Sequence, residues 1–224
     1  LTAMYWYSET MRSQAIDWRP EVHDSDGLAM WTGSGERIWR PLNNPPSVMT
    51  NSFQDKDPRG FGFLQRDRNF DHFQDDGVFY DRRPSVWVEP KGEWGKGAVQ
   101  LVEIPTDREI DDNLVVYWVP TEPVFAGRPL EFGYKLYWDK DEPNPTDLGR
   151  VQATYHGVGG MPGQPRPEGA VRFVVDFTGP KVAALKRGDG KAEITVSRGN
   201  VTLSAAYPAV AGEPGVYRVF FDLI

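Results

Sequence analysis

Acidic residues in turn-like contexts are the first candidates for chemistry in this chain. Hydrolysis of a glycosidic bond needs one protonated carboxyl group that donates to the leaving oxygen. It also needs a second carboxylate that activates water or attacks directly. The acids in such contexts are Glu21, Asp24, Asp26, Asp81, Glu103, Asp111 and Asp112. The sequence therefore contains enough acidic residues for a catalytic pair, but residue type alone does not show which two form it.

Two of these contexts are distinctive. In Asp111-Asp112-Asn113 the adjacent acids repel each other, and burial of either would raise its pKa, which is one route to a carboxyl group that stays protonated near neutrality. The alternative is a turn in which Asp and Asn cap the local backbone, and composition alone favours the turn. His23 beside Asp24 predicts either an imidazole that orients the carboxylate or a structural hydrogen bond.

Other chemistries lack their signatures. The chain has no cysteine, which excludes a thiol nucleophile, a disulfide scaffold and a thiolate metal site. The three histidines are far apart without metal-ligand spacing, and residues 24–27 (DSDG) lack the glycine position and bidentate glutamate of a calcium loop. No phosphate-binding loop or nucleophile-elbow motif occurs. We therefore expect no metal and no cofactor. The net charge of −7 argues against nucleic acid as a partner and is compatible with a neutral polymer.

The elements that must position these acids are predicted to be β-strands. Alternating runs rich in β-branched and aromatic residues occupy positions 98–104, 113–119 and 130–138, and turn residues bound them. With 39% hydrophobic residues and proline and glycine spread along the chain, this pattern predicts an all-β sandwich or barrel. One short helix is predicted over residues 7–17, with Ser8 as its N-cap.

The composition changes near residue 139, because all eight tryptophans precede it. We predict a first unit over residues 1–140, a charged and proline-rich linker over 141–150, and a small immunoglobulin-like sandwich over 151–224. Strands of the second unit are predicted at 152–156, 171–177, 192–197, 202–207 and 216–223. They are fewer than that fold usually has, and both ends of the chain are apolar, so we expect a segment of a longer protein with an incomplete second domain.

Long strings within the first 138 residues resemble the signature blocks of a known family. The blocks are residues 19–28, 33–44, 58–70, 80–97 and 102–118, with a looser continuation over 169–179. They resemble the periplasmic glucan biosynthesis proteins G and D (the OpgG/OpgD family). The resemblance implies that the first unit is the C-terminal part of a large galactose-mutarotase-like β-sandwich. It also implies a periplasmic location, with a signal peptide in the part that precedes this chain.

The same resemblance implies a reaction, which is inverting endo-hydrolysis of the β-1,2-glucan backbone of osmoregulated periplasmic glucans. Asp112 matches the family's general acid, and Asp111 stands at the preceding position, where the family commonly has Asn. Asp24 matches the general base, and Tyr80 matches a tyrosine that links base and substrate through water. The residues expected to support the acids are His23, Ser25, Asp111 and Asn113.

Aromatic and charged side chains are expected to bind the sugar rings and their hydroxyl groups. The residues chosen are Trp39, Arg40, Arg83, Trp87, Trp94 and Glu103. For each tryptophan, a place in the core is the alternative. The expected partners are the β-1,2-glucan polymer and the membrane glucan synthase, and a homodimer is also considered. Two alternatives to hydrolysis stay open: a non-catalytic glucan-binding protein that shapes or transfers the polymer, and a partner of the synthase.

Overall fold

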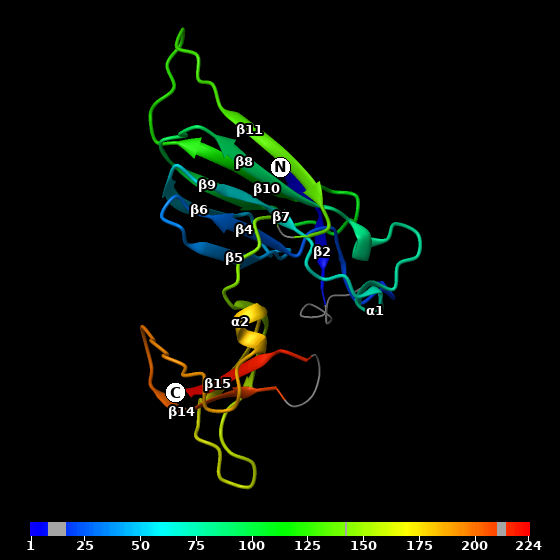
Figure 1. Cartoon of the computed structure of the whole chain (residues 1–224). Coiled ribbons are helices and arrows are strands. Elements are labelled where there is room, and N and C mark those ends of the chain that lie inside the picture. The colour runs from blue at the N-terminus through cyan, green and yellow to red at the C-terminus, as the bar shows by residue number, and fades with distance from the viewer. Residues whose placement is uncertain (9–16, 142, 210–213) are drawn as a thin grey trace. The chain divides into compact units, whose positions relative to one another are not determined.

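Antiparallel strands make up almost all of the regular structure in the computed structural model, which describes residues 1–8, 17–141, 143–209 and 214–224 (Figure 1). This confirms the all-β prediction. The chain divides into two units, Leu1–Asn144 and Pro145–Ile224. The division falls within residues 141–150, the segment predicted as a linker.

The first unit is a sandwich of two antiparallel sheets. One sheet contains β1 (Thr2–Ala3), β6 (Met49–Lys56), β9 (Lys96–Glu103) and β10 (Leu114–Pro120), in the order β1-β10-β9-β6. The other contains β4 (Gly27–Trp31), β5 (Arg37–Pro41), β7 (Gly60–Leu64), β8 (Ser85–Lys91) and β11 (Gly133–Asp139), in the order β11-β8-β7-β4-β5. The strands predicted at 98–104, 113–119 and 130–138 are confirmed as β9, β10 and β11.

Alternation along the strands builds the main core of this sandwich. Successive side chains of a strand point to opposite faces of the sheet, so every second residue can face the opposite layer. Leu101 on β9 and Val116 on β10 are fully buried, and they belong to one cluster with Phe63 on β7 and Val86 on β8. The predicted period of two therefore describes how the two sheets pack together.

Short elements complete the first unit. They are β2 (Tyr5–Tyr7), β3 (Val22–His23), the helix α1 (Phe70–Phe73) and the 3₁₀ turn η2 (Tyr80–Arg82). β2 pairs with β3, and a small second core joins β2 and β3 to Phe73 of α1 and Tyr80 of η2. The helix predicted over 7–17 is wrong at its start, since Tyr7 ends a strand, and residues 9–16 lie outside the described residues.

The second unit contains one four-stranded antiparallel sheet among its described residues. Its strands are β12 (Arg150–Val158), β13 (Val171–Thr178), β14 (Val201–Pro208) and β15 (Tyr217–Leu223), in the order β12-β13-β15-β14, with the short helix α2 (Pro180–Ala183) after β13. Four of the five predicted strands are confirmed. Each of the two α-helices in the described chain has four residues, far fewer than a membrane-spanning helix requires.

The strand predicted at 192–197 is wrong. Ala192, Ile194 and Val196 are half-buried and alternate with exposed residues, so the predicted inward face exists. Ile194 lines an apolar groove together with Phe177 of β13. No neighbouring strand pairs with this segment in the described part of the unit, and a strand requires such a pairing. The alternation of residues correctly indicated which side chains face inward. It did not indicate that the backbone forms hydrogen bonds with a neighbouring strand.

Two tryptophan rings lie across glycines on the face of the five-stranded sheet that points away from the main core. A methyl group at Gly27 would lie 2.1 Å from the ring of Trp39. A methyl group at Gly60 would lie 2.3 Å from the ring of Trp87. The bare glycine backbone on β4 and β7 therefore makes room for the edges of the two rings.

We expect Gly60→Ala to lower the free energy of unfolding by about 1–3 kcal/mol, because the added methyl group overlaps the buried Trp87 ring. Gly77→Ala is the control, since a methyl group there would meet only Asp75 Oδ1 at an ordinary 3.5 Å. Urea unfolding of both variants measures the effect. Equal stability of the two would show that the ring is not confined by this glycine.

Candidate active site

The first residues of the chain hold the two predicted catalytic aspartates. The Thr2 hydroxyl donates to Asp112 Oδ2 at 3.0 Å, and the Met4 N–H donates to Asp24 Oδ1 at 2.9 Å. The Asp24 N–H donates in return to the Met4 carbonyl at 3.1 Å. Thr2 and Met4 are two residues apart along extended backbone, a rise of about 7 Å. Two turns that are far apart in sequence therefore place their carboxylates beside one short segment. The predicted supporting residue Ser25, next to Asp24, is buried.

The buried Asn113 side chain fixes this segment. Its Oδ1 accepts the Tyr5 N–H at 2.8 Å, and its Nδ2 donates to the carbonyl oxygens of Tyr5 at 3.1 Å and Ile104 at 2.9 Å. An amide can both donate and accept, so it satisfies the backbone between β1, which pairs with β10, and β2, which pairs with β3. An aspartate there would supply acceptors only, which explains physically why position 113 carries an amide.

The two aspartates differ in environment. Asp112 is exposed, whereas Asp24 is half-buried, and desolvation by its surroundings is the main cause that raises the pKa of Asp24. The negative charge of Asp112 raises the pKa of Asp24 further, so the two carboxylates lie within electrostatic reach of each other. The Met4 N–H and the charge of Arg83 act in the opposite direction. The pair thus consists of a sheltered carboxyl group and a solvent-facing one.

Asp111 is engaged in its own contacts. Its carboxylate accepts the Thr106 hydroxyl at 2.7 Å and forms an ion pair with Arg108 at 2.6 Å. These hydrogen bonds, that of Thr106 first, hold the pKa of Asp111 below its ordinary value. The prediction that adjacent acids and burial raise the pKa is therefore wrong for Asp111, because a local hydroxyl and guanidinium stabilise its charge.

Tyr80 lies beside a group of carboxylates that share one arginine. Its hydroxyl donates to Glu109 Oε1 at 2.6 Å, and burial raises the pKa of Tyr80. Arg19 donates to both Glu109 oxygens, at 2.8 and 2.7 Å, and also to Asp75 at 2.6 Å and Asp17 at 2.7 Å. The hydrogen bond from Arg19 is the main cause that lowers the pKa of Glu109. The Tyr80 proton is thus directed toward Glu109 and not toward Asp24.

Neither Glu109 nor Arg19 was predicted from the sequence as a site residue. Glu109 is three residues before Asp112 on the same connection, and Arg19 is five residues before Asp24, with the short strand β3 between them. That proximity was the available signal. It could not show that the two residues meet, because an ion pair between distant turns has no periodic pattern.

His23 takes the structural role that the sequence left open. Its Nδ1 lies 3.1 Å from Gln65 Oε1, and its Nε2 lies 2.8 Å from Glu21 Oε2. Its ring stacks on Tyr5 with the ring centroids 4.7 Å apart. Both ring nitrogens therefore contact groups other than Asp24, which His23 influences through charge alone.

Among the charged residues predicted to contact sugar, Arg83 lies at the acids and the other two do not. The Arg83 guanidinium lies 5.4 Å from the centre of the Tyr80 ring, and its charge acts on Asp24. Arg40 forms an ion pair at 2.6 Å with the fully buried Glu103. Because Arg40 is on β5 and Glu103 on β9, this pair joins the two sheets of the sandwich.

The three tryptophans predicted to bind sugar occupy other places. Trp39 lies on the outer face of the five-stranded sheet, under the Arg66 guanidinium at 3.5 Å. Trp87 lies on the same face and is 2% exposed. Trp94 packs against the main core, and its indole N–H donates to the Gly133 carbonyl at 3.1 Å. Its aromatic neighbours are Phe61, Trp118, Phe132 and Tyr134.

A metal site is not part of this arrangement as far as the structure describes the chain. No group of three or more histidine, aspartate or glutamate side chains there is arranged to hold a metal ion. The carboxylates around Arg19 instead form ion pairs with its guanidinium. Carboxyl groups can give and take protons, which is the chemistry that the two aspartates can supply.

Comparison with known proteins relates this chain to glucan biosynthesis proteins. The model of the family described as "Periplasmic glucan biosynthesis protein, MdoG" matches residues 1–224. Glucans biosynthesis protein D 2 of Ralstonia nicotianae is 57% identical over 223 residues, which cover 99% of this chain and 41% of that protein. Glucans biosynthesis protein D of Stenotrophomonas maltophilia is 52% identical over 224 residues, which cover 100% and 42%. The chain therefore spans about two fifths of the length of these curated relatives.

We expect Arg19→Met to lower the free energy of unfolding by about 2–4 kcal/mol at neutral pH, because it leaves three carboxylates without their shared cation. The range is below that of a sealed ion pair because Glu109 is partly exposed. Arg19 lowers the pKa values of Asp17 and Glu109, so its stabilisation is complete above their unfolded values near pH 4. It is lost as the pH falls through the lower folded values.

Urea unfolding across this pH range measures the difference. Arg82→Met is the control, because Arg82 is 70% exposed and lies 3.5 Å from Asp81. If Arg19→Met lowers the free energy of unfolding by the same amount at acidic as at neutral pH, the ionic explanation is contradicted.

Proposed function

This chain belongs to the periplasmic glucan biosynthesis family, and from that premise we propose that Asp112 and Asp24 hydrolyse the β-1,2-linked backbone of periplasmic glucans. The reaction would be an inverting endo-hydrolysis in the periplasm. The observation that carries the proposal is the pair of hydrogen bonds by which Thr2 and Met4 hold the two carboxylates beside one segment. The family's name supports the compartment and the glucan.

Inversion sets a requirement on the spacing of the two carboxyl groups. Inverting glycosidases keep their carboxyl groups about 6.5–9.5 Å apart to admit a water molecule, whereas retaining enzymes keep them about 5–5.5 Å apart. The proposed inversion therefore requires the carboxyl groups of Asp24 and Asp112 to lie in the wider range. A water molecule placed between substrate and Asp24 then attacks the anomeric carbon while Asp112 protonates the leaving oxygen.

The different environments of the two aspartates suit these two roles. Asp112 is exposed and can reach a polymer that approaches from solvent. Asp24 is sheltered, and its raised pKa makes its carboxylate a stronger base than a solvated one. Asp111 is held by Thr106 and Arg108, so it does not compete with Asp112 for the glycosidic oxygen.

Tyr80 is proposed to position the water path. Its proton is directed to Glu109, which leaves its oxygen lone pairs to accept a hydrogen bond from water on the other side. Arg19 keeps Glu109 ionised and thereby fixes the direction of the Tyr80 hydroxyl. Tyr80 then orders the water molecule, and the water molecule gives its own proton to Asp24.

Asp112→Asn is expected to lower the rate of glucan shortening by about 10²–10⁴-fold, because it removes the proton donor. The measurement is the chain length of linear β-1,2-glucan after incubation with this chain and with the full-length protein. Asp111→Asn is the matched control, since it changes the neighbouring acid whose contacts lie with Arg108 and Thr106. Full shortening by Asp112→Asn would refute the assignment of the acid. Binding without shortening by the unaltered proteins would favour a glucan-binding protein.

Arg83→Gln is expected to move the acidic limb of the kcat/KM profile to higher pH. The base must be ionised, so activity rises as the pH increases through the pKa of Asp24. The charge of Arg83 lowers that pKa, and its removal therefore raises it. Arg82→Gln, at the adjacent exposed position, is the control and should leave the limb unmoved. A limb that stays in place or moves to lower pH in Arg83→Gln would exclude Asp24 as the titrating base.

A further inference from the structure

The buried side chain of Gln65 joins the turn that holds Asp24 to the turn that holds Tyr80. Gln65 is 1% exposed and follows β7. Its Nε2 donates to the carbonyl oxygens of His23 at 3.1 Å and Tyr80 at 3.2 Å, and its Oε1 lies 3.1 Å from His23 Nδ1. The opposite orientation of the amide would bring its oxygen against two carbonyl oxygens, which have no proton to donate. The two carbonyl groups therefore fix the amide with its oxygen toward His23 Nδ1.

The imidazole of His23 consequently has an acceptor at each ring nitrogen. Gln65 Oε1 faces Nδ1, and Glu21 Oε2 lies 2.8 Å from Nε2. An amide oxygen has only lone pairs to offer, so Nδ1 carries the proton of the first hydrogen bond. At Nε2, an unprotonated nitrogen would present its lone pair to the lone pairs of a carboxylate. A second proton therefore lies between Nε2 and Glu21.

This second proton is held better by the imidazole than by the carboxylate. In unfolded chains a glutamic acid loses its proton at about pH 4.3 and an imidazolium at about pH 6.5, so a proton shared between them stays with the histidine. The Glu21 side chain is 16% exposed, so its negative charge is not sealed from solvent. The contact of 2.8 Å is in the range of a charge-assisted hydrogen bond. The geometry thus favours an imidazolium paired with a carboxylate.

The groups that face the ring from other elements are compatible with a positive charge. Tyr5 of β2 stacks on the ring with the two planes 5° apart, and an aromatic face attracts a cation. Burial raises the pKa of Tyr5, so its hydroxyl group stays neutral. Phe73 of α1 meets the ring edge-on with the centroids 5.1 Å apart. Asp24 and Asp26 follow His23 in the turn before β4; desolvation raises their pKa values, and the positive charge of His23 acts against that rise.

We propose that His23 is an imidazolium at neutral pH, paired with Glu21, and that it is a positioning residue that places a fixed positive charge next to Asp24. The charge state is independent of the reaction, whereas its effect on the base rests on the proposed function. A ring that is protonated on both nitrogens cannot accept the proton of the attacking water, which leaves that role to Asp24. The positive charge also helps the Asp24 carboxylate to stay ionised in its desolvated position.

Nitrogen-15 NMR of the histidine rings tests the charge state without any substrate. The chain has three histidines, and His72→Gln and His156→Gln assign their signals by removing them. The spectrum is recorded at about pH 8, where an ordinary histidine has one unprotonated ring nitrogen. His23 is expected to show a proton on both ring nitrogens at this pH. An unprotonated ring nitrogen on His23 would overturn the proposal.

Glu21→Gln is expected to remove the proton from His23 Nε2 at the same pH and to leave the proton on Nδ1. The new amide can donate to Nε2, whereas Gln65 Oε1 still needs a donor at Nδ1. Two protons that persist in Glu21→Gln would show that the carboxylate does not hold the imidazolium, and would contradict the pairing.

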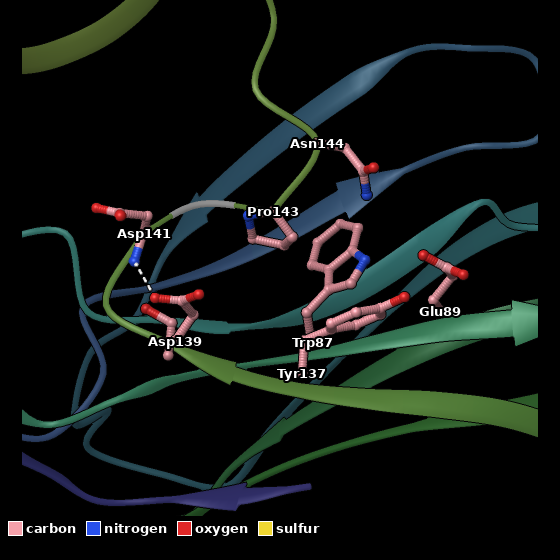
Figure 2. Close-up of a pocket in the computed structure, with 8 residues that line it drawn as sticks. Trp87, Glu89, Tyr137, Asp139, Asp141, Pro143 and Asn144 are labelled. Carbon is pink, nitrogen blue, oxygen red and sulfur yellow. Dashed lines mark hydrogen bonds between the residues drawn. The ribbon is translucent and has the colours of Figure 1, made fainter.

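Glu89→Gln is the matched control, because Glu89 is half-buried like Glu21. Figure 2 shows Glu89 beside Trp87 and Tyr137 in a pocket on the outer face of the five-stranded sheet, and the residues that line this pocket include no histidine. The replacement should therefore leave both His23 protons in place. Loss of the Nε2 proton in this control as well would contradict a specific pair between His23 and Glu21.

The effect on Asp24 is measured through its carboxyl ¹³C signal during a pH titration. In Glu21→Gln the Asp24 signal should show a step at the pH at which His23 loses its Nε2 proton. The unaltered chain should lack this step at that pH, because His23 keeps its charge there. A variant in which His23 titrates without a step at Asp24 would overturn the role of His23 as a positioning residue.

The charge state and the hydrolytic function can fail separately. A doubly protonated His23 in a protein that never shortens glucan would support the charge state and contradict the hydrolytic function. Shortening of glucan by a protein with a neutral His23 would support the hydrolytic function and contradict the inference about His23.

Discussion

The backbone hydrogen bonds of residues 2–5 are the constraint on which the candidate site depends. This segment leaves one sheet at β1 and pairs with β3 at β2, so its polar groups need partners between the two pairings. The Asn113 amide supplies partners for Tyr5, and Asp24 supplies one for Met4. Satisfying these groups is what draws the turn before β10 and the turn before β4 to the same place. The carboxylates are therefore positioned by the requirement to satisfy the backbone.

Charge is distributed around this segment in two different ways. On the side of Tyr80, Arg19 forms ion pairs with three carboxylates, and Glu109 accepts a hydrogen bond from the Tyr80 hydroxyl. On the side of Asp24 the carboxyl group is half-buried and accepts one backbone N–H, while Arg83 acts on it through charge. The first arrangement stabilises ionised acids and fixes a hydroxyl group. The second raises the pKa of one carboxylate, which suits a base better than a structural acid.

The aromatic residues explain a further part of the architecture. The five-stranded sheet buries aliphatic side chains and phenylalanines on its inner face and carries tryptophans on its outer face. Glycines on β4 and β7 allow the Trp39 and Trp87 rings to lie close to the backbone. The outer face therefore combines flat rings with acidic side chains, whereas the aspartate pair is surrounded by tyrosine, arginine and backbone amides.

The sequence by itself determined the strands, because alternation of polar and apolar residues is a local pattern that matches the pleat of a strand. It located β9, β10 and β11 and four strands of the second unit. It was wrong at 192–197, because alternation marks a buried face and pairing needs a neighbour. The resemblance selected Asp24 and Asp112, but only the tertiary structure decided that Tyr80 donates to Glu109 and that Arg19 joins three turns. Such contacts depend on which distant turns meet in the folded chain, and no repeating pattern of residues in the sequence predicts those meetings.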